Sequence, residues 1–147
     1  MIDKQMRLSC IFLLLAALLA AMACGGGTVK SSTPDTMPTP SGAALSKDVQ
    51  PIFNTSCVVC HQGAGQAGLT LEPGKSYSNL VNVPSTESPL KRVVPGASDQ
   101  SYLLAKLSGT QVQVGGSGAQ MPFGAPPLSQ AQISVIQQWI QLGAPNN

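Results

Sequence analysis

Apolar residues recur at helical spacing in three stretches of the chain, and nowhere do they alternate convincingly as in β-strands. The first stretch holds Val49, Ile52 and Phe53 at positions i, i+3 and i+4, which is typical of one buried helix face. It predicts a helix that begins with Asp48 as its N-cap and leads directly into Cys57. The pattern as a whole predicts an all-α domain.

The second and third predicted helices are bounded by capping residues. Ser98 is the expected N-cap of a helix over 99–107, and Gly109 lies just past its end. The third helix follows positions 129–132, which read Ser-Gln-Ala-Gln and form a capping box, and it is expected to end before Gly143. The expected buried residues of these two helices are Leu103, Leu104, Leu107, Ile133, Ile136, Trp139 and Ile140.

The N-terminus resembles an export signal. Lys4 and Arg7 precede an apolar run over 8–23, which is too short and too rich in small residues at its end for a convincing membrane span. The run ends in Ala-Met-Ala before Cys24 and three glycines, a sequence that resembles a bacterial lipobox. We therefore predict a signal over 1–23 and lipid attachment at Cys24. Ordinary cleavage that leaves Cys24 as a free thiol stays open.

Composition changes after the predicted signal. Residues 24–44 are rich in Gly, Ser, Thr and Pro and show no apolar periodicity. They comprise the lipidated Cys24 and a predicted flexible tether over 25–44. Residues 45–147 suit one small domain. A domain of this size has a thin core unless something large and apolar fills it.

The most specific motif lies at positions 57–61, which read Cys-Val-Val-Cys-His. C-x-x-C-H is the attachment sequence for c-type haem. The thiols of Cys57 and Cys60 add to the haem vinyl groups, and His61, the one histidine of the chain, then serves as the proximal iron ligand. Two alternatives are weaker. A redox disulfide would lack a βαβ pattern around it, and a structural zinc site would lack a fourth ligand.

The cysteine count supports haem attachment. Of four cysteines, Cys10 leaves with the signal, Cys24 takes lipid, and Cys57 and Cys60 take haem, so none remains for a structural disulfide. Haem is attached to this motif outside the cytoplasm in bacteria, which agrees with an export signal. The formal net charge of +2 and the lack of a basic patch argue against a nucleic-acid partner.

The order of these elements resembles class I cytochrome c, in particular the mono-haem domains of planctomycetes and of many exported proteobacterial proteins. The resemblance covers nearly all of residues 45–147. It implies a cytochrome c fold, with three or more short helices and long loops wrapped around one covalently bound haem. In the family the first and last helices cross, which implies contacts of Val49 and Phe53 with the last helix. The matching segments are 49–53, 57–61, 94–96, 101–103, 121–122 and 139–144.

Met121 is the expected sixth ligand of the iron. It is the only methionine after the haem motif, and it follows a glycine-rich stretch over 115–118 that permits a backbone to approach a flat ligand closely. The resemblance implies the same assignment. The alternatives are Lys75, Lys91, Lys106 or water.

Other residues are expected beside the haem. In the family a proline carbonyl accepts the N–H of the proximal imidazole, and Pro73 is favoured over Pro95 for this role. Arg92 is a candidate partner for a haem propionate, with a solvated loop charge as the alternative. Tyr77, Tyr102 and Trp139 can donate to the same propionates or simply pack.

Together these residues predict a one-electron carrier rather than an enzyme. A thioether ligand raises the reduction potential and leaves no open iron position. The alternative is a haem enzyme or gas sensor with an open or labile sixth position, and a docking subunit of a larger oxidoreductase is a third reading. Lipid on Cys24 would tether the protein in the bacterial periplasm, with the outer membrane favoured. There it is expected to act as a monomer that meets redox partner proteins.

Overall fold

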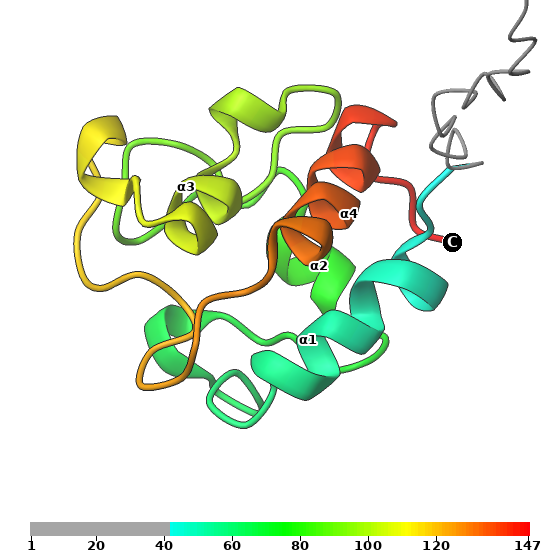
Figure 1. Cartoon of the computed structure of the whole chain (residues 1–147), viewed down its shortest axis with the longest axis horizontal. Coiled ribbons are helices and arrows are strands. Elements are labelled where there is room, and N and C mark those ends of the chain that lie inside the picture. The colour runs from blue at the N-terminus through cyan, green and yellow to red at the C-terminus, as the bar shows by residue number, and fades with distance from the viewer. Residues whose placement is uncertain (1–41) are drawn as a thin grey trace, which may run out of the picture. The chain divides into compact units, whose positions relative to one another are not determined.

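Four short α-helices form the regular structure of residues 42–147, the part of the chain that the computed structural model describes (Figure 1). Within these residues there is no β-strand, and extended pairing is limited to two isolated bridges, Val81 with Val93 and Pro84 with Lys91. The predicted all-α class is therefore confirmed. The helices are α1 (Gln50–Ser56), α2 (Ser76–Leu80), α3 (Tyr102–Ser108) and α4 (Gln130–Gln141), with a π-helical turn at Leu45–Val49 and 3-10 turns at Gln66–Gly68, Ser98–Gln100 and Gln111–Val114.

The predicted signal over 1–23 and the predicted lipid site at Cys24 lie outside the described residues, as does most of the predicted tether. Ala43, which falls in the last part of that tether, is buried against the hydrophobic core. Packing therefore begins at least as early as Ala43. Between residues 42 and 147 no helix is long and apolar enough to cross a membrane.

The first helix begins earlier than the sequence predicts. Its π-helical first turn starts at Leu45 and continues without a break into α1. The Asp48 carboxylate accepts the Ala44 N–H at 2.8 Å, and Asn147 accepts the N–H groups of Leu45 and Ser46 at 3.0 and 2.8 Å. The prediction of Asp48 as N-cap was wrong, because the free amides of the first turn find partners at the far end of the chain, where no local pattern reveals them.

The last helix follows its sequence pattern closely. Ser129 Oγ accepts the Gln132 N–H at 3.3 Å, and the Gln132 side chain accepts the Ser129 N–H at 2.9 Å, so the predicted capping box is confirmed. Gly143, at a φ of +94°, lies beyond the end of α4. Trp139 satisfies its buried ring N–H by donating to the Pro145 carbonyl at 2.9 Å.

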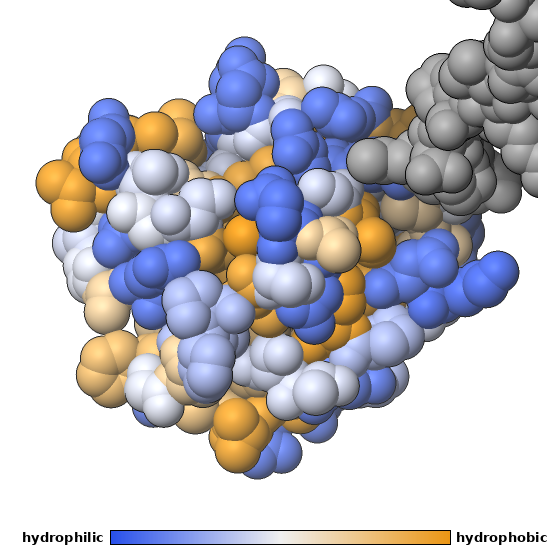
Figure 2. All heavy atoms as spheres, viewed as in Figure 1, coloured by the Kyte–Doolittle hydropathy of each residue, from blue (hydrophilic) through white to orange (hydrophobic). Residues whose placement is uncertain are grey.

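The core lies where α4 packs between the first helix and α3 (Figure 1). Ile136, Trp139 and Ile140 have no exposed surface, and neither do Val49 and Phe53 on the first helix. All five side chains belong to one hydrophobic cluster. The face of the molecule shown in Figure 2 carries both polar and apolar residues, and the apolar ones lie in separate groups between the polar ones.

The second predicted helix is shorter than expected. The chain forms a separate 3-10 turn at Ser98–Gln100, and α3 begins only after Ser101. Gly109 ends α3 with a φ of +75°, as predicted. Leu103 and Leu107 are buried as expected, but Leu104 is only half-buried. The charged residue Lys106, which the pattern did not predict to be buried, is 7% exposed.

Replacing Phe53 with alanine tests this description of the core. Phe53→Ala is expected to lower the free energy of unfolding by about 3–5 kcal/mol, because it leaves a cavity beside α4. Phe123, which is 76% exposed, is the matched control, and Phe123→Ala is expected to change stability by less than about 0.5 kcal/mol. Denaturant titration of the purified variants measures both, and equal losses would contradict the packing.

Candidate functional site

The Cys-x-x-Cys-His motif forms a turn that continues from the end of α1. The Cys57 N–H donates to the Phe53 carbonyl at 2.8 Å, as in a helix. The Cys57 carbonyl in turn accepts the N–H groups of Cys60 and His61 at 3.1 and 3.0 Å. All three chemically active side chains of the motif therefore project from one hydrogen-bonded turn.

Both thiols of the motif are free. Cys57 is half-buried and Cys60 is exposed. Burial raises the pKa of Cys57 to about 11, so its thiol is protonated at neutral pH, unlike the low-pKa thiolates of redox disulfide enzymes. In residues 42–147 no three His, Cys, Asp or Glu side chains are arranged to hold a metal ion. The geometry thus favours neither the redox disulfide nor the zinc alternative.

His61 is oriented by a backbone carbonyl. Its Nδ1 lies 3.2 Å from the Leu69 oxygen. Because a carbonyl oxygen only accepts, this bond places the proton on Nδ1 and leaves the Nε2 lone pair available to a metal. Pro73 was expected to supply this carbonyl, but the structure gives the role to Leu69. Pro73 lies farther along, exposed in the turn after Glu72.

The chain turns back sharply after His61, which explains why Leu69 reaches the imidazole. The Leu71 N–H donates to the His61 carbonyl at 2.8 Å, so the loop closes before Pro73. Gly65 has a φ of +48°, and a Cβ at this position would collide with the Leu69 carbonyl. Only glycine lets that carbonyl approach closely enough to remain beside the imidazole.

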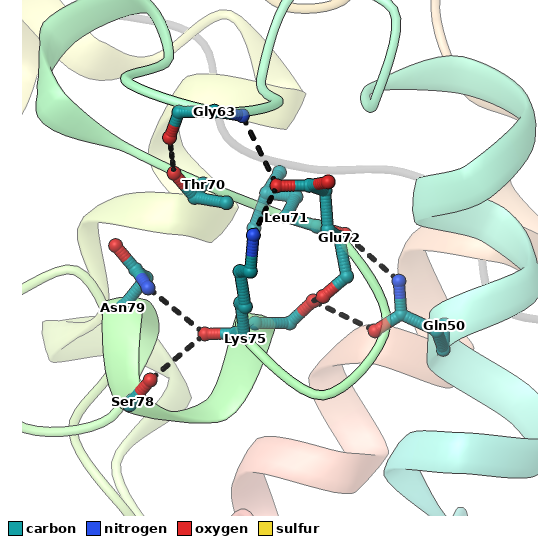
Figure 3. Close-up of polar contacts among 9 residues, drawn as sticks. Gln50, Gly63, Thr70, Leu71, Glu72, Lys75, Ser78 and Asn79 are labelled. Carbon is teal, nitrogen blue, oxygen red and sulfur yellow. Dashed lines mark hydrogen bonds and ion pairs between the residues drawn. The ribbon is translucent and has the colours of Figure 1, made fainter.

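Polar side chains fasten this loop to α1 and α2 (Figure 3). Gln50, buried on α1, donates to the Leu71 carbonyl at 2.8 Å and accepts the Ser76 hydroxyl at 2.7 Å. Glu72 accepts the Gly63 N–H at 3.0 Å. Hydrogen bonds from Lys75 and from Gly63 lower the pKa of the Glu72 carboxyl, so it is ionised at neutral pH.

Arg92 holds the same loop from the other side. Its guanidinium donates to the carbonyls of Ala67 and Gly68 at 2.9 and 3.2 Å, and to that of Asn79 at 2.9 Å. Ala67 and Gly68 directly precede Leu69. Arg92 is buried, and its desolvation lowers its pKa. No carboxylate among residues 42–147 lies within ion-pair distance of its guanidinium. The alternative prediction, that Arg92 is a solvated charge in a loop, was wrong because the residue is buried.

Met121 lies half-buried against the hydrophobic core. Cys57, Val58 and Leu69 pack against the same cluster, so both expected ligand segments border one apolar interior. The Met121 N–H donates to the Lys106 carbonyl at 3.0 Å.

The lysines named as alternative ligands each have a partner. Lys75 pairs with Glu72 at 3.0 Å, Lys106 pairs with Glu87 at 2.9 Å, and Lys91 donates to the Asn82 side chain at 3.2 Å. Each of the three amino groups is therefore engaged with a side chain of the protein.

Two of the aromatic residues expected to donate to propionates, Tyr102 and Trp139, donate to backbone carbonyls of the protein. Tyr102 donates to the Ser117 carbonyl at 3.2 Å, and Trp139 donates to Pro145. Tyr77 lines a pocket of about 370 Å³ beside α1, together with Pro73. Neither this pocket nor another of about 270 Å³ beside α3 is lined by the motif or by Met121.

No protein-family model matches the chain, and no curated protein matches it. Among solved structures it is similar to one titled Kuenenia stuttgartiensis hydrazine synthase, with 21% sequence identity and a TM-score of 0.46. The similarity covers 69% of this chain and 16% of the other. A similarity of this size supports no argument about activity, so function must be inferred from the residues of this chain.

Substitution of Gly65 tests whether the Leu69 carbonyl needs its close approach. Gly65→Ala is expected to cost at least about 2 kcal/mol more than its control, because the new Cβ displaces the Leu69 carbonyl. The control is Gly63→Ala, since Gly63 also has a positive φ, +59°, but a Cβ there meets nothing within 4 Å. It is expected to cost about 1–2 kcal/mol from backbone strain alone.

Denaturant titration of the two glycine variants measures these costs, and the NMR shift of the His61 side-chain nitrogens reports the imidazole hydrogen bond. The shift is expected to change in Gly65→Ala only. Equal costs and an unchanged shift in both variants would contradict the role of Gly65.

Proposed function

We propose that this chain is a one-electron carrier with a single c-type haem, attached through Cys57 and Cys60. His61 and Met121 would bind its iron. The observation that carries the proposal is the turn over 57–61. Its two free thiols precede an imidazole whose Nδ1 is hydrogen-bonded to the Leu69 carbonyl.

The donor set fits this group. Two unpaired thiols at the spacing of the attachment motif are available for thioether bonds. The imidazole has its Nδ1 occupied, which is the usual arrangement of a ligating histidine. The thioether of Met121 borders the same apolar core as Cys57. Arg92, a buried cation with no carboxylate partner among residues 42–147, is a candidate for a propionate charge.

When bound, the haem supplies an iron centre that gains and loses one electron reversibly. The protein residues determine how it does so. His61 is held in one tautomer and one orientation by Leu69, and the soft thioether of Met121 favours the ferrous form and so raises the reduction potential. A methionine in the sixth position also keeps small molecules from binding there. With His61 and Met121 holding the iron, a reduced donor protein would supply the electron and an oxidised acceptor protein would take it, with no bond made or broken.

The same proposal includes the location of the protein. A signal over 1–23 and lipid on Cys24 would place the domain in the bacterial periplasm on a membrane tether. Val59, within the motif, and Phe123, close to Met121, are 77% and 76% exposed. Apolar side chains at such positions suit brief contacts with redox partner proteins.

Spectroscopy of Met121→Ala tests the ligand pair. Wild-type protein, produced in a host that attaches haem, is expected to show the weak sulfur-to-iron charge-transfer band in its ferric form and to bind carbon monoxide slowly when reduced. Met121→Ala is expected to lose the band and to bind carbon monoxide rapidly, because its sixth position is open. A high-spin wild type without the band would favour the haem enzyme or gas sensor.

Attachment has its own test. Cys57→Ser and Cys60→Ser are each expected to leave one thioether bond, and the double variant none, which denaturing electrophoresis with haem staining detects. Haem that stays bound to the denatured double variant would contradict attachment at this motif.

A further inference from the structure

Lys106 is a buried cation in the last turn of α3. Its side chain is 9% exposed, and its Nζ lies 2.9 Å from the Glu87 carboxylate and 2.7 Å from the Ser117 carbonyl. The ammonium also lies 5.7 Å from the centre of the Tyr102 ring. Burying such a charge is costly, and a buried ion pair often adds no net stability. Its position therefore needs an explanation other than stability.

Two hydrogen bonds of Lys106 lead to segment 115–121, which ends at Met121. The Ser117 carbonyl accepts two hydrogen bonds, one from Lys106 and one from Tyr102 at 3.2 Å. Gln111 donates to the next carbonyl, that of Gly118, at 2.9 Å. Segment 115–121 is thus bonded to side chains of α3 and of the turn that follows it.

The end of the segment is bonded to the backbone of α3. The Met121 N–H donates to the carbonyl of Lys106 itself at 3.0 Å, and Gln120 donates to the Leu107 carbonyl at 2.8 Å. Lys106 therefore holds the segment at two points, with its ammonium at Ser117 and with its carbonyl at Met121.

Gly116 and Gly118 of this segment face α3. A Cβ at Gly116 would collide with the Tyr102 ring, and a Cβ at Gly118 would lie 2.9 Å from Lys106 Nζ. The sequence predicted that these glycines permit close approach to a flat ligand. In the structure Gly116 permits close approach to Tyr102, and Gly118 permits close approach to Lys106.

We propose that the Lys106–Glu87 ion pair is a positioning device for Met121. By holding segment 115–121 on α3, the pair keeps the Met121 thioether at a fixed place for the iron and resists its displacement by other ligands. Glu87 comes from the loop before α3, so its pair with Lys106 links that loop to α3 and, through the Ser117 carbonyl, to segment 115–121. The inference rests on the proposed function, since it assumes that Met121 ligates the haem iron.

The test compares two variants of this pair with a matched control in the haem-loaded protein. Lys106→Leu removes the ammonium, and Glu87→Gln keeps the shape of the side chain but removes its charge. The control is Lys75→Leu, which breaks an exposed Lys75–Glu72 pair of similar length, 3.0 Å. External imidazole competes with Met121 for ferric iron, so its affinity reports how firmly the thioether is held.

Imidazole affinity is expected to rise about tenfold or more in Lys106→Leu and Glu87→Gln, because a charge-assisted restraint on Met121 is lost. The charge-transfer band is expected to weaken, and hydrogen exchange at the Met121 amide to speed up, in both variants. Lys75→Leu is expected to stay within about twofold of wild type, as an exposed pair contributes little.

The possible outcomes separate the two proposals. If wild type shows the charge-transfer band but both variants match Lys75→Leu in imidazole affinity and in Met121 exchange, the positioning role is overturned and the proposed function stands. If wild type itself lacks the band, the proposed function fails and this inference fails with it. Should Lys106→Leu not fold, Glu87→Gln decides by the same criteria.

Discussion

The hydrogen bond between His61 Nδ1 and the Leu69 carbonyl is the contact on which the candidate site depends. It fixes which ring nitrogen carries the proton and therefore which nitrogen can bind iron. The rest of the loop serves this contact. Gly65 leaves room for the carbonyl, Arg92 holds the two preceding carbonyls, and Gln50 holds the carbonyl two residues later. The loop is thus held by side-chain hydrogen bonds to three of its backbone carbonyls.

The two expected ligand segments are held in similar ways. Arg92 donates to backbone carbonyls next to Leu69, and Lys106 donates to a backbone carbonyl in the segment that ends at Met121. Both cations are buried, and neither of the two segments is part of an α-helix. In a domain with four short helices, charge-assisted bonds to carbonyls give the long loops a defined position. Glycines make these bonds possible by letting the backbone come close.

Predictions that depend on neighbouring residues were confirmed, and predictions that depend on contacts between distant parts of the chain were wrong. The capping box at Ser129 and the end of α3 at Gly109 were correct because their partners lie within a few residues. The predicted start of the first helix was wrong, because Asn147 accepts hydrogen bonds from the amides of its first turn. In the site, the motif residues could be named from sequence. The roles of Leu69 and Lys106 could not, because a carbonyl acceptor and a buried lysine have no sequence signature before the loops are placed.

The central claim is that Met121 and His61 together ligate one haem iron. Proton NMR of the reduced, haem-loaded protein tests it most directly, because the methyl group of a ligating methionine lies above the porphyrin ring and its ring current shifts the resonance strongly upfield. A three-proton signal far upfield of the ordinary methyl region, absent from Met121→Ala, is the predicted result. A reduced spectrum without any such methyl signal would contradict the assignment of Met121 and, with it, the electron-carrier function.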